Sequence, residues 1–229
     1  NWDIEAAEKG GYPHFMLKEI FEQPGAVTKT VSPRIKDGLP ELELGDLTDE
    51  KLKSLSKIHI VACGTAMHAG MIGKSVIEKL SRTPVDVCIA SEFRYCDPIL
   101  RPDELVVIIS QSGETADTLA ALRLAKEKGV PTLAIVNVVG SSIAREADSV
   151  IYTWAGPEIA VASTKAYTVQ MSVMYLFAFK LGLVKKSVSE ETIRSYCKEL
   201  VDMPQKMEQI LTHSEDCKYY ASQFQNASN

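Results

Sequence analysis

The 229-residue sequence has no excess of positive charge and no hydrophobic run long enough to span a membrane. Its 25 Lys and Arg residues stand against 30 Asp and Glu residues, a net charge of −5, which argues against nucleic acid or an anionic membrane as the partner. The uncharged run 166–179 is shorter than the roughly 20 apolar residues of a membrane span, so it predicts a buried helix. Ten Pro and 13 Gly are too few for a disordered or fibrous chain.

The sequence also lacks a disulfide framework and a clustered metal site. An odd number of cysteines, with no CxxC pair and no recognisable signal peptide, predicts reduced thiols in a cytoplasmic protein. The cysteines are Cys63, Cys88, Cys96, Cys197 and Cys217. The four histidines cluster with neither carboxylates nor cysteines. We therefore expect no metal and no other cofactor.

Hydrophobic patterning divides the chain into three parts. Residues 1–55 contain no clear strand, but they predict a helix over Tyr12–Gln23, ended by Pro24-Gly25, and an acidic connector over Gly38–Glu50. Residues 56–211 form the main domain, and residues 212–229 are expected to add a C-terminal helix over about Ser214–Phe224.

Short runs rich in Val and Ile alternate with helical stripes in the main domain. The predicted strands are Ile58–Ala62, Val85–Ile89, Leu105–Ile109, Thr132–Val136 and Ser149–Thr153. Apolar stripes predict helices over 69–80 and 116–124, followed by two long helices, Ser163–Leu181 and Ser189–Leu211. Near-continuous hydrophobic strands alternating with helices predict the α/β class, with a mostly five-stranded, doubly wound parallel sheet and extra helices at both ends.

The turn after the strand 105–109 has the residues best suited to bind an anion. Residues 110–115, with the sequence SQSGET, offer three hydroxyls, a carboxamide and a run of backbone N–H groups, but no Lys or Arg. A helix N-terminus carries roughly half a positive charge and unpaired N–H donors, so this turn suits a phosphate dianion. Gly113 would let the backbone approach the anion, and Glu114 should point away from it.

An alternative explanation remains open for each polar turn. Residues 110–115 could be an N-capping loop with no ligand, although they hold more hydroxyls than a cap requires. Gly64-Thr65, after the strand 58–62, could be only a tight turn. Gly140-Ser141-Ser142, at the same sheet edge, could be a cap or a ligand contact.

The apolar helix Ser163–Leu181 raises two further questions. It could be simple core, which we favour, or it could pack against a partner domain. Lys165 in its first turn opposes the helix dipole, which indicates an anionic neighbour such as Glu158. The alternative is a surface lysine that reaches solvent.

These turns and their flanks resemble a known family. Residues 63–65 (CGT), 110–119 (SQSGETADTL) and 161–166 (VASTKA) are similar to the first sugar isomerase (SIS) domain of the glutamine–fructose-6-phosphate aminotransferases, also called glucosamine-6-phosphate synthases. Residues 14–24, 90–95 and 140–142 extend the resemblance over nearly the whole chain.

The resemblance implies a three-layer α/β/α sandwich that binds the phosphate of fructose 6-phosphate or glucosamine 6-phosphate. Carried over position by position, the phosphate ligands would be Thr65, Ser110, Gln111, Ser112 and Thr115. Val161 and Ser163 would lie near the sugar. The parent reaction makes glucosamine 6-phosphate from fructose 6-phosphate and ammonia released from glutamine.

Two departures from the family pattern limit what this chain is expected to do. The family commonly has Ser where this chain has Ala66, which removes one hydroxyl donor. No residue matches the catalytic groups of the second SIS domain or the nucleophilic cysteine of the glutaminase domain. We expect an excised domain that binds a hexose 6-phosphate without catalysis and whose partners are those two domains and a second copy in a homodimer.

Two rival functions remain. A non-catalytic sugar-phosphate sensor would usually carry a DNA-binding segment, and residues 1–55 contain no basic recognition helix. An isomerase with a single SIS domain per subunit would need a Glu or His base above the phosphate site at a dimer interface, for which Glu158 and His68 are the candidates.

Overall fold

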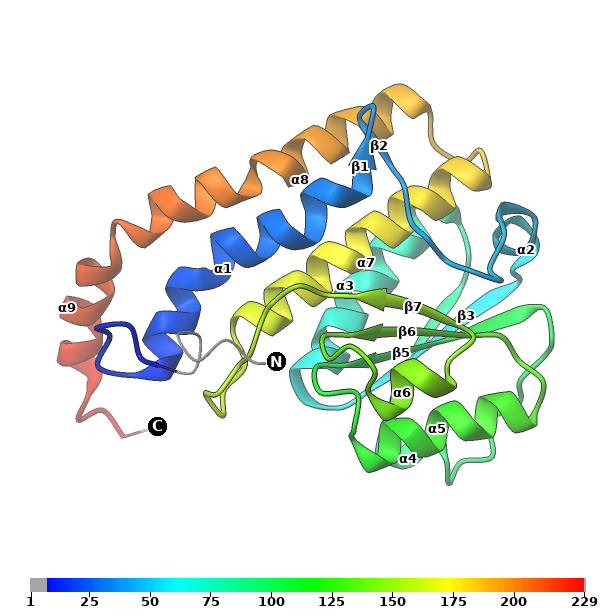
Figure 1. Cartoon of the computed structure of the whole chain (residues 1–229), viewed down its shortest axis with the longest axis horizontal. Coiled ribbons are helices and arrows are strands. Elements are labelled where there is room, and N and C mark those ends of the chain that lie inside the picture. The colour runs from blue at the N-terminus through cyan, green and yellow to red at the C-terminus, as the bar shows by residue number, and fades with distance from the viewer. Residues whose placement is uncertain (1–7, 229) are drawn as a thin grey trace.

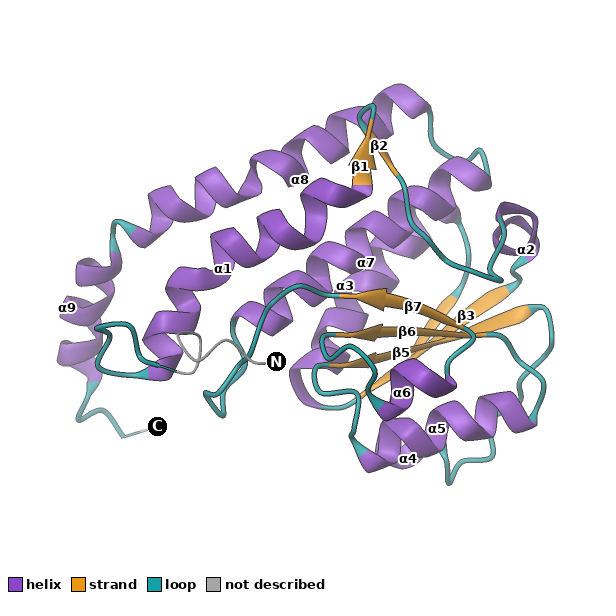
Figure 2. Cartoon of the chain, in the orientation of Figure 1, coloured by secondary structure: helices purple, strands orange, loops and turns teal. Residues whose placement is uncertain are grey.

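The computed structural model describes residues 8–228 and is built around a parallel sheet between two layers of helices (Figures 1 and 2). The sheet has five strands in the order β4-β3-β5-β6-β7, and every neighbouring pair is parallel. The strands are β3 (Lys57–Ala62), β4 (Val85–Ile89), β5 (Glu104–Ser110), β6 (Thr132–Val136) and β7 (Ser149–Tyr152). The predicted α/β class and the five parallel strands are confirmed.

Each face of the sheet is covered by its own set of helices. One face packs against α3 (Gly64–Ser81) and α7 (Lys165–Val184), with α1 (Phe15–Val31) and α8 (Glu190–Leu211) outside them. The other face carries α4 (Ala90–Phe93), α5 (Ala116–Glu127) and α6 (Ser142–Glu146). Along β5, Val107 and Ile109 face the first layer while Val106 and Ile108 face the second. Both faces are buried, which is why the strands read as unbroken apolar runs.

The helix α7 is a core helix. Its length and composition would allow it to cross a membrane, but 61% of its most apolar stretch is buried inside the domain. It lies between α3 and α1, and its buried side chains include Val173, Phe177 and Leu181. The prediction of a core helix is therefore confirmed.

The prediction that Pro24-Gly25 ends the first helix is wrong. The helix α1 continues to Val31 with Pro24 inside it. Proline has no N–H to donate to the carbonyl of Ile20, and the side-chain amide of Gln23 donates to that oxygen instead, at 2.9 Å. The lost backbone bond is thus replaced, and the following residues Val27 and Val31 are buried in the core.

A small hairpin follows α1, in a segment where the sequence shows no clear strand. After the 3-10 turn Ser32–Arg34, strands β1 (Ile35–Lys36) and β2 (Leu39–Pro40) pair antiparallel around Asp37 and Gly38. Strands of two residues are too short to show an alternating pattern. The short helix α2 (Asp49–Ser54) then leads to the sheet, with Thr48 as its N-cap.

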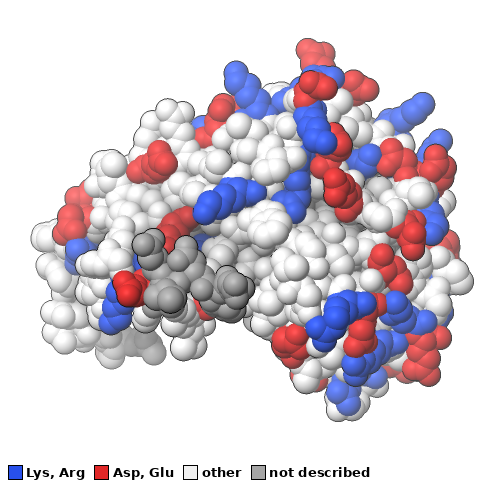
Figure 3. Space-filling model, in the orientation of Figure 1, with Lys and Arg blue, Asp and Glu red and all other residues white. Residues whose placement is uncertain are grey.

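The two C-terminal helices follow the prediction closely. Ser189 caps α8 by accepting a hydrogen bond from Thr192 N, and α9 spans Ser214–Phe224. The helix α8 runs beside α1 on the side away from the sheet (Figure 1). On the face shown in Figure 3, positive and negative side chains are interspersed.

Candidate functional site

A pocket of about 270 Å³ opens beyond the carboxyl ends of β3 and β5. The five residues that the resemblance implies as phosphate ligands and the two that it places near the sugar all line it. The lining side chains are Cys63, Thr65, Ala66, Ile109, Ser110, Gln111, Ser112, Thr115, Thr118, Glu158, Ala160, Val161, Ser163 and Gln170. Three segments far apart in the sequence therefore meet at the sheet edge where an open parallel sheet binds ligands.

Two hydroxyls of the turn between β5 and α5 accept hydrogen bonds from the backbone of the same turn. Ser110 Oγ accepts a hydrogen bond from Gly113 N at 3.0 Å and lies 3.4 Å from Thr115 Oγ1. Ser112 Oγ accepts from Glu114 N at 3.2 Å. No side chain caps α5, because Thr115 occupies the N-cap position without a cap hydrogen bond. A capping role therefore does not account for the hydroxyls of this turn.

Gly113 brings the turn against the next loop of the sheet edge. Its φ angle is +67°, and a Cβ placed there would lie 2.1 Å from Ser141 Oγ and 2.6 Å from Ser141 Cβ. The carbonyl of Gly113 accepts from Ile143 N at 3.1 Å. Only glycine fits this position, both for its backbone conformation and for the space available.

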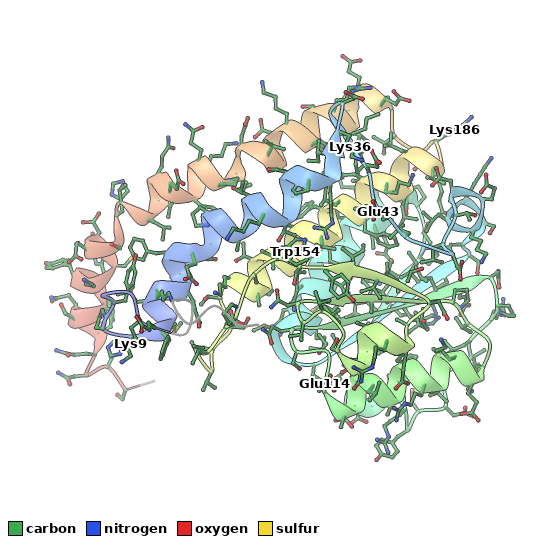
Figure 4. All side chains as sticks on the ribbon, in the orientation of Figure 1. Lys9, Lys36, Glu43, Glu114, Trp154 and Lys186 are labelled. Atoms are coloured by element: carbon green, nitrogen blue, oxygen red, sulfur yellow. The ribbon has the colours of Figure 1, made fainter. Side chains whose placement is uncertain are left out.

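The loop 140–142 supports the turn and does not line the pocket. Ser141 is the N-cap residue of α6 but makes no side-chain cap bond. Ser142 N donates to the Glu114 carboxylate at 2.8 Å, and this bond holds the pKa of Glu114 below its usual range. Glu114 points toward α6 (Figure 4) and does not line the pocket, in the direction that the sequence predicts. The loop therefore has neither of the two roles considered for it: it supplies no side-chain cap, and it does not line the pocket.

The N-terminus of α3 is the second helix N-terminus at the pocket. Its N-cap, Cys63, makes no side-chain cap bond, and Gly64 has a φ angle of +57°. Thr65 is exposed at the pocket wall, while Ala66 is buried. Each of the helices α3 and α5 thus presents uncapped N–H groups and about half a positive charge to the same pocket.

The loop between β7 and α7 forms the opposite wall. Glu158 accepts hydrogen bonds from Thr164 N at 2.9 Å and Ala166 N at 3.1 Å, so its carboxylate caps α7. Ser163 is half-buried, and Val161 is fully exposed at 106%. Trp154, at the start of this loop, lies beside α1 (Figure 4), and its backbone N–H donates to Thr30 Oγ1.

Lys165 has a different partner from the one expected. Its Nζ lies 2.5 Å from the Glu22 carboxylate, and its side chain is only 4% exposed. The prediction that Glu158 is its partner is wrong, and so is the alternative of a surface lysine that reaches solvent. Glu22 lies on α1, 143 positions away in the sequence, so no local pattern indicates the pair.

Glu19 on α1 holds the same loop. It is 2% exposed, and its Oε1 accepts from Ile159 N at 2.6 Å and Ala160 N at 3.1 Å. Sequence reasoning assigns Glu19 no role, although it lies in the segment 14–24 that contributes to the family resemblance. The helix α1 is therefore a support for the pocket wall.

Replacing Glu19 by Ala is expected to loosen this wall. Two N–H donors lose a carboxylate partner, so the free energy of unfolding should fall by about 1–3 kcal/mol, as measured by urea denaturation. Affinity for a hexose 6-phosphate should fall several-fold in calorimetry. Glu19→Gln is the control, because it keeps one acceptor oxygen and should lose less of both. A stability loss with unchanged affinity would show that Glu19 does not position the loop.

The two alternative bases of a single-domain isomerase lie in different places, and only one of them lines the pocket. Glu158 lines the pocket, but both of its hydrogen bonds hold the start of α7. His68 is exposed on α3 and is not among the pocket residues. Within residues 8–228, no three His, Cys, Asp or Glu side chains are grouped as a metal site would require.

Comparison with known proteins decides the family. The family model described as "SIS domain" matches residues 51–180, more than half of the chain. The chain belongs to the SIS domain family. The match covers the whole sheet and the helices α3 to α6, including both turns that supply the hydroxyls of the pocket.

Close relatives carry the name that the resemblance implies. The glutamine–fructose-6-phosphate aminotransferase (isomerizing) of Clostridium acetobutylicum is 53% identical over 96% of this chain, which covers 36% of that protein. The enzyme of the same name from Caldanaerobacter subterraneus is 53% identical over 100% of the chain, 38% of its own length. This SIS domain chain thus spans little more than a third of these relatives.

A solved structure confirms the fold. The C-terminal domain of glucosamine-fructose-6-phosphate aminotransferase from Francisella tularensis superposes with a TM-score of 0.91 at 40% identity. The alignment covers 96% of this chain and 62% of that domain. The resemblance to the first SIS domain of these enzymes is therefore confirmed in both sequence and fold.

Proposed function

We propose that this SIS domain binds the phosphate group of a hexose 6-phosphate, fructose 6-phosphate or glucosamine 6-phosphate. The observation that carries the proposal is the convergence of two uncapped helix N-termini, those of α3 and α5, on one pocket. The proposed phosphate ligands are Thr65, Ser110, Gln111, Ser112 and Thr115. All of them are neutral donors, and no Lys or Arg lines the pocket among the described residues.

The sugar would extend from the phosphate toward the loop between β7 and α7, where Val161 and Ser163 lie. Ser163 has a hydroxyl to offer, and Val161 provides an apolar surface that is fully exposed in this domain. The pocket is near the small end of ligand sites, which typically enclose about 300–1,000 Å³. That size suits one monosaccharide phosphate rather than a dinucleotide.

In the parent protein, the domain would serve the synthesis of glucosamine 6-phosphate from fructose 6-phosphate and ammonia released from glutamine. We place the division between an N-terminal segment, the SIS domain and a C-terminal helix at residues 1–55, 56–211 and 212–229. The proposed partners are a second SIS domain, a glutaminase domain and a second copy of the chain. We place the protein in the cytoplasm, consistent with the five free cysteines.

This chain alone should bind the ligand without converting it. The acidic side chain at the pocket, Glu158, holds the start of α7, and the proposed catalytic groups belong to the second SIS domain. Three phosphate hydrogen bonds of about 1.5–3 kcal/mol each give roughly 5–9 kcal/mol before the cost of association. The expected dissociation constant is therefore millimolar to high micromolar.

Calorimetry with fructose 6-phosphate, fructose and inorganic phosphate tests the proposal. We expect measurable binding of fructose 6-phosphate and phosphate and none of fructose. Equal binding of fructose 6-phosphate and fructose would refute the phosphate site. A coupled isomerase assay on the same sample should show no turnover, and turnover would favour an isomerase with one SIS domain per subunit.

A further inference from the structure

The side-chain amide of Gln170 is the part of the pocket that phosphate binding leaves unused. Gln170 lies in the second turn of α7, is only 3% exposed and lines the same pocket as residues 110–115. Its Oε1 is buried and has no hydrogen-bond partner within residues 8–228. An unpartnered buried amide oxygen costs folding free energy, because its bonds to water are lost without replacement. Because Gln170 lines the pocket, a ligand bound there becomes the missing partner once the amide turns Oε1 toward it.

The chemistry of Oε1 indicates which part of the ligand it serves. An amide oxygen accepts hydrogen bonds, and a phosphate dianion has no proton to donate. A sugar hydroxyl does donate one. If the amide is rotated by half a turn, its NH₂ group occupies the same place and donates to a hydroxyl oxygen instead. A phosphate oxygen would also accept from that NH₂ group, so it is the orientation found here, with Oε1 unpartnered among residues 8–228, that points to a hydroxyl donor.

Several other acceptors on the pocket wall already have hydrogen-bond partners. The Glu158 carboxylate accepts two backbone N–H groups at the start of α7. The hydroxyls of Ser110 and Ser112 accept N–H groups within their own turn. Gln170 is also neutral, whereas a free carboxylate at this place would repel a phosphate.

We propose that Gln170 binds a hydroxyl group of the sugar, so that the pocket recognises a polyhydroxy phosphate monoester and not phosphate alone. This inference rests on the proposed phosphate site. It divides the pocket between residues 65 and 110–115, which hold the phosphate, and Gln170 with Ser163, which face the hydroxyl-bearing part of the ligand.

The test compares Gln170→Met with the wild-type chain. Methionine has a similar length and no hydrogen-bonding amide. We expect the dissociation constant for fructose 6-phosphate to rise at least fivefold and that for inorganic phosphate to change less than twofold. The melting temperature without ligand should stay equal or rise, because an unpartnered buried polar group is removed. Ser172→Ala is the control, since Ser172 is a buried polar residue of α7 outside the pocket.

Three results would overturn the inference. A variant that loses affinity for both ligands by the same factor, or for neither, shows that Gln170 does not contact the sugar. A lowered melting temperature with an unchanged ratio of the two affinities shows a structural role only. If the wild-type chain itself fails to prefer fructose 6-phosphate over fructose, the phosphate site is refuted, and the role of Gln170 is refuted with it.

Discussion

Replacing Ser112 and Thr115 together by Ala is expected to abolish the preference for fructose 6-phosphate over fructose. Both residues line the pocket, and neither hydroxyl caps the helix α5. Each hydrogen bond to a charged phosphate contributes about 1.5–3 kcal/mol, so the double variant should lose roughly 3–6 kcal/mol of binding free energy. That corresponds to a loss of about 10²–10⁴-fold in affinity, which places binding beyond detection by calorimetry.

The control for this variant removes two hydroxyls from the neighbouring loop. Ser141→Ala with Ser142→Ala changes residues of the same sheet edge that do not line the pocket. Ser142 donates to Glu114 through its backbone N–H, which the substitution keeps, although it removes a second hydrogen bond from the Ser142 hydroxyl. This control should therefore retain the preference. A Ser112→Ala, Thr115→Ala chain that still distinguished fructose 6-phosphate from fructose would show that the phosphate binds elsewhere.

Replacing Gly113 by Ala is expected to destabilise the domain and to disrupt its anion site. The new methyl group would meet Ser141 Oγ at 2.1 Å, and the backbone would have to keep a φ angle of +67°. A left-handed conformation costs about 1–2 kcal/mol for a residue with a side chain, and overpacking costs about 1–3 kcal/mol more. The free energy of unfolding in urea should therefore fall by about 2–5 kcal/mol.

The chain contains a matched control for this substitution. Gly140 has a similar φ angle of +74°, but no atom of residues 8–228 lies within 4 Å of the place where its Cβ would be. Gly140→Ala should therefore cost only the conformational part, about 1–2 kcal/mol. Adding Ser141→Gly to Gly113→Ala removes both clashing atoms and should recover the difference. Equal losses for Gly113→Ala and Gly140→Ala would contradict the close packing between the two loops.

Local pattern is sufficient to place the sheet and most helices of this domain. The strand β5 is apolar on both faces because both faces are covered, and β4 and β6 have the bounds that their Val- and Ile-rich runs predict. The polar turn 110–115 is visible because its hydroxyls follow directly after a buried strand. Parallel topology then brings it beside Thr65, because neighbouring parallel strands end at the same edge.

Local pattern fails where a side-chain hydrogen bond or the packing of distant segments decides the outcome. Pro24 reads as the end of a helix, yet α1 continues because the Gln23 amide donates to the Ile20 carbonyl and residues beyond it are buried. The position of Lys165 at the start of a helix predicts an anionic neighbour, but the residues around it do not indicate that this neighbour is Glu22 on α1. In the sequence, Gln170 is only one of several polar residues in a mostly apolar helix, so nothing marks it out.

The sequence by itself therefore determined the α/β class, the order of the five parallel strands and the long helices, and the hydroxyl-rich turn, since each depends on residues a few positions apart. Only the tertiary structure decided that α1 supports the pocket wall through Glu19 and Glu22, and that Gln170 lines the pocket while its Oε1 has no partner in the described part of the chain. The physical reason is the range of the interactions. Periodicity and helix ends are set by neighbouring residues, whereas ion pairs and unpartnered buried atoms exist only once segments more than a hundred positions apart are packed together.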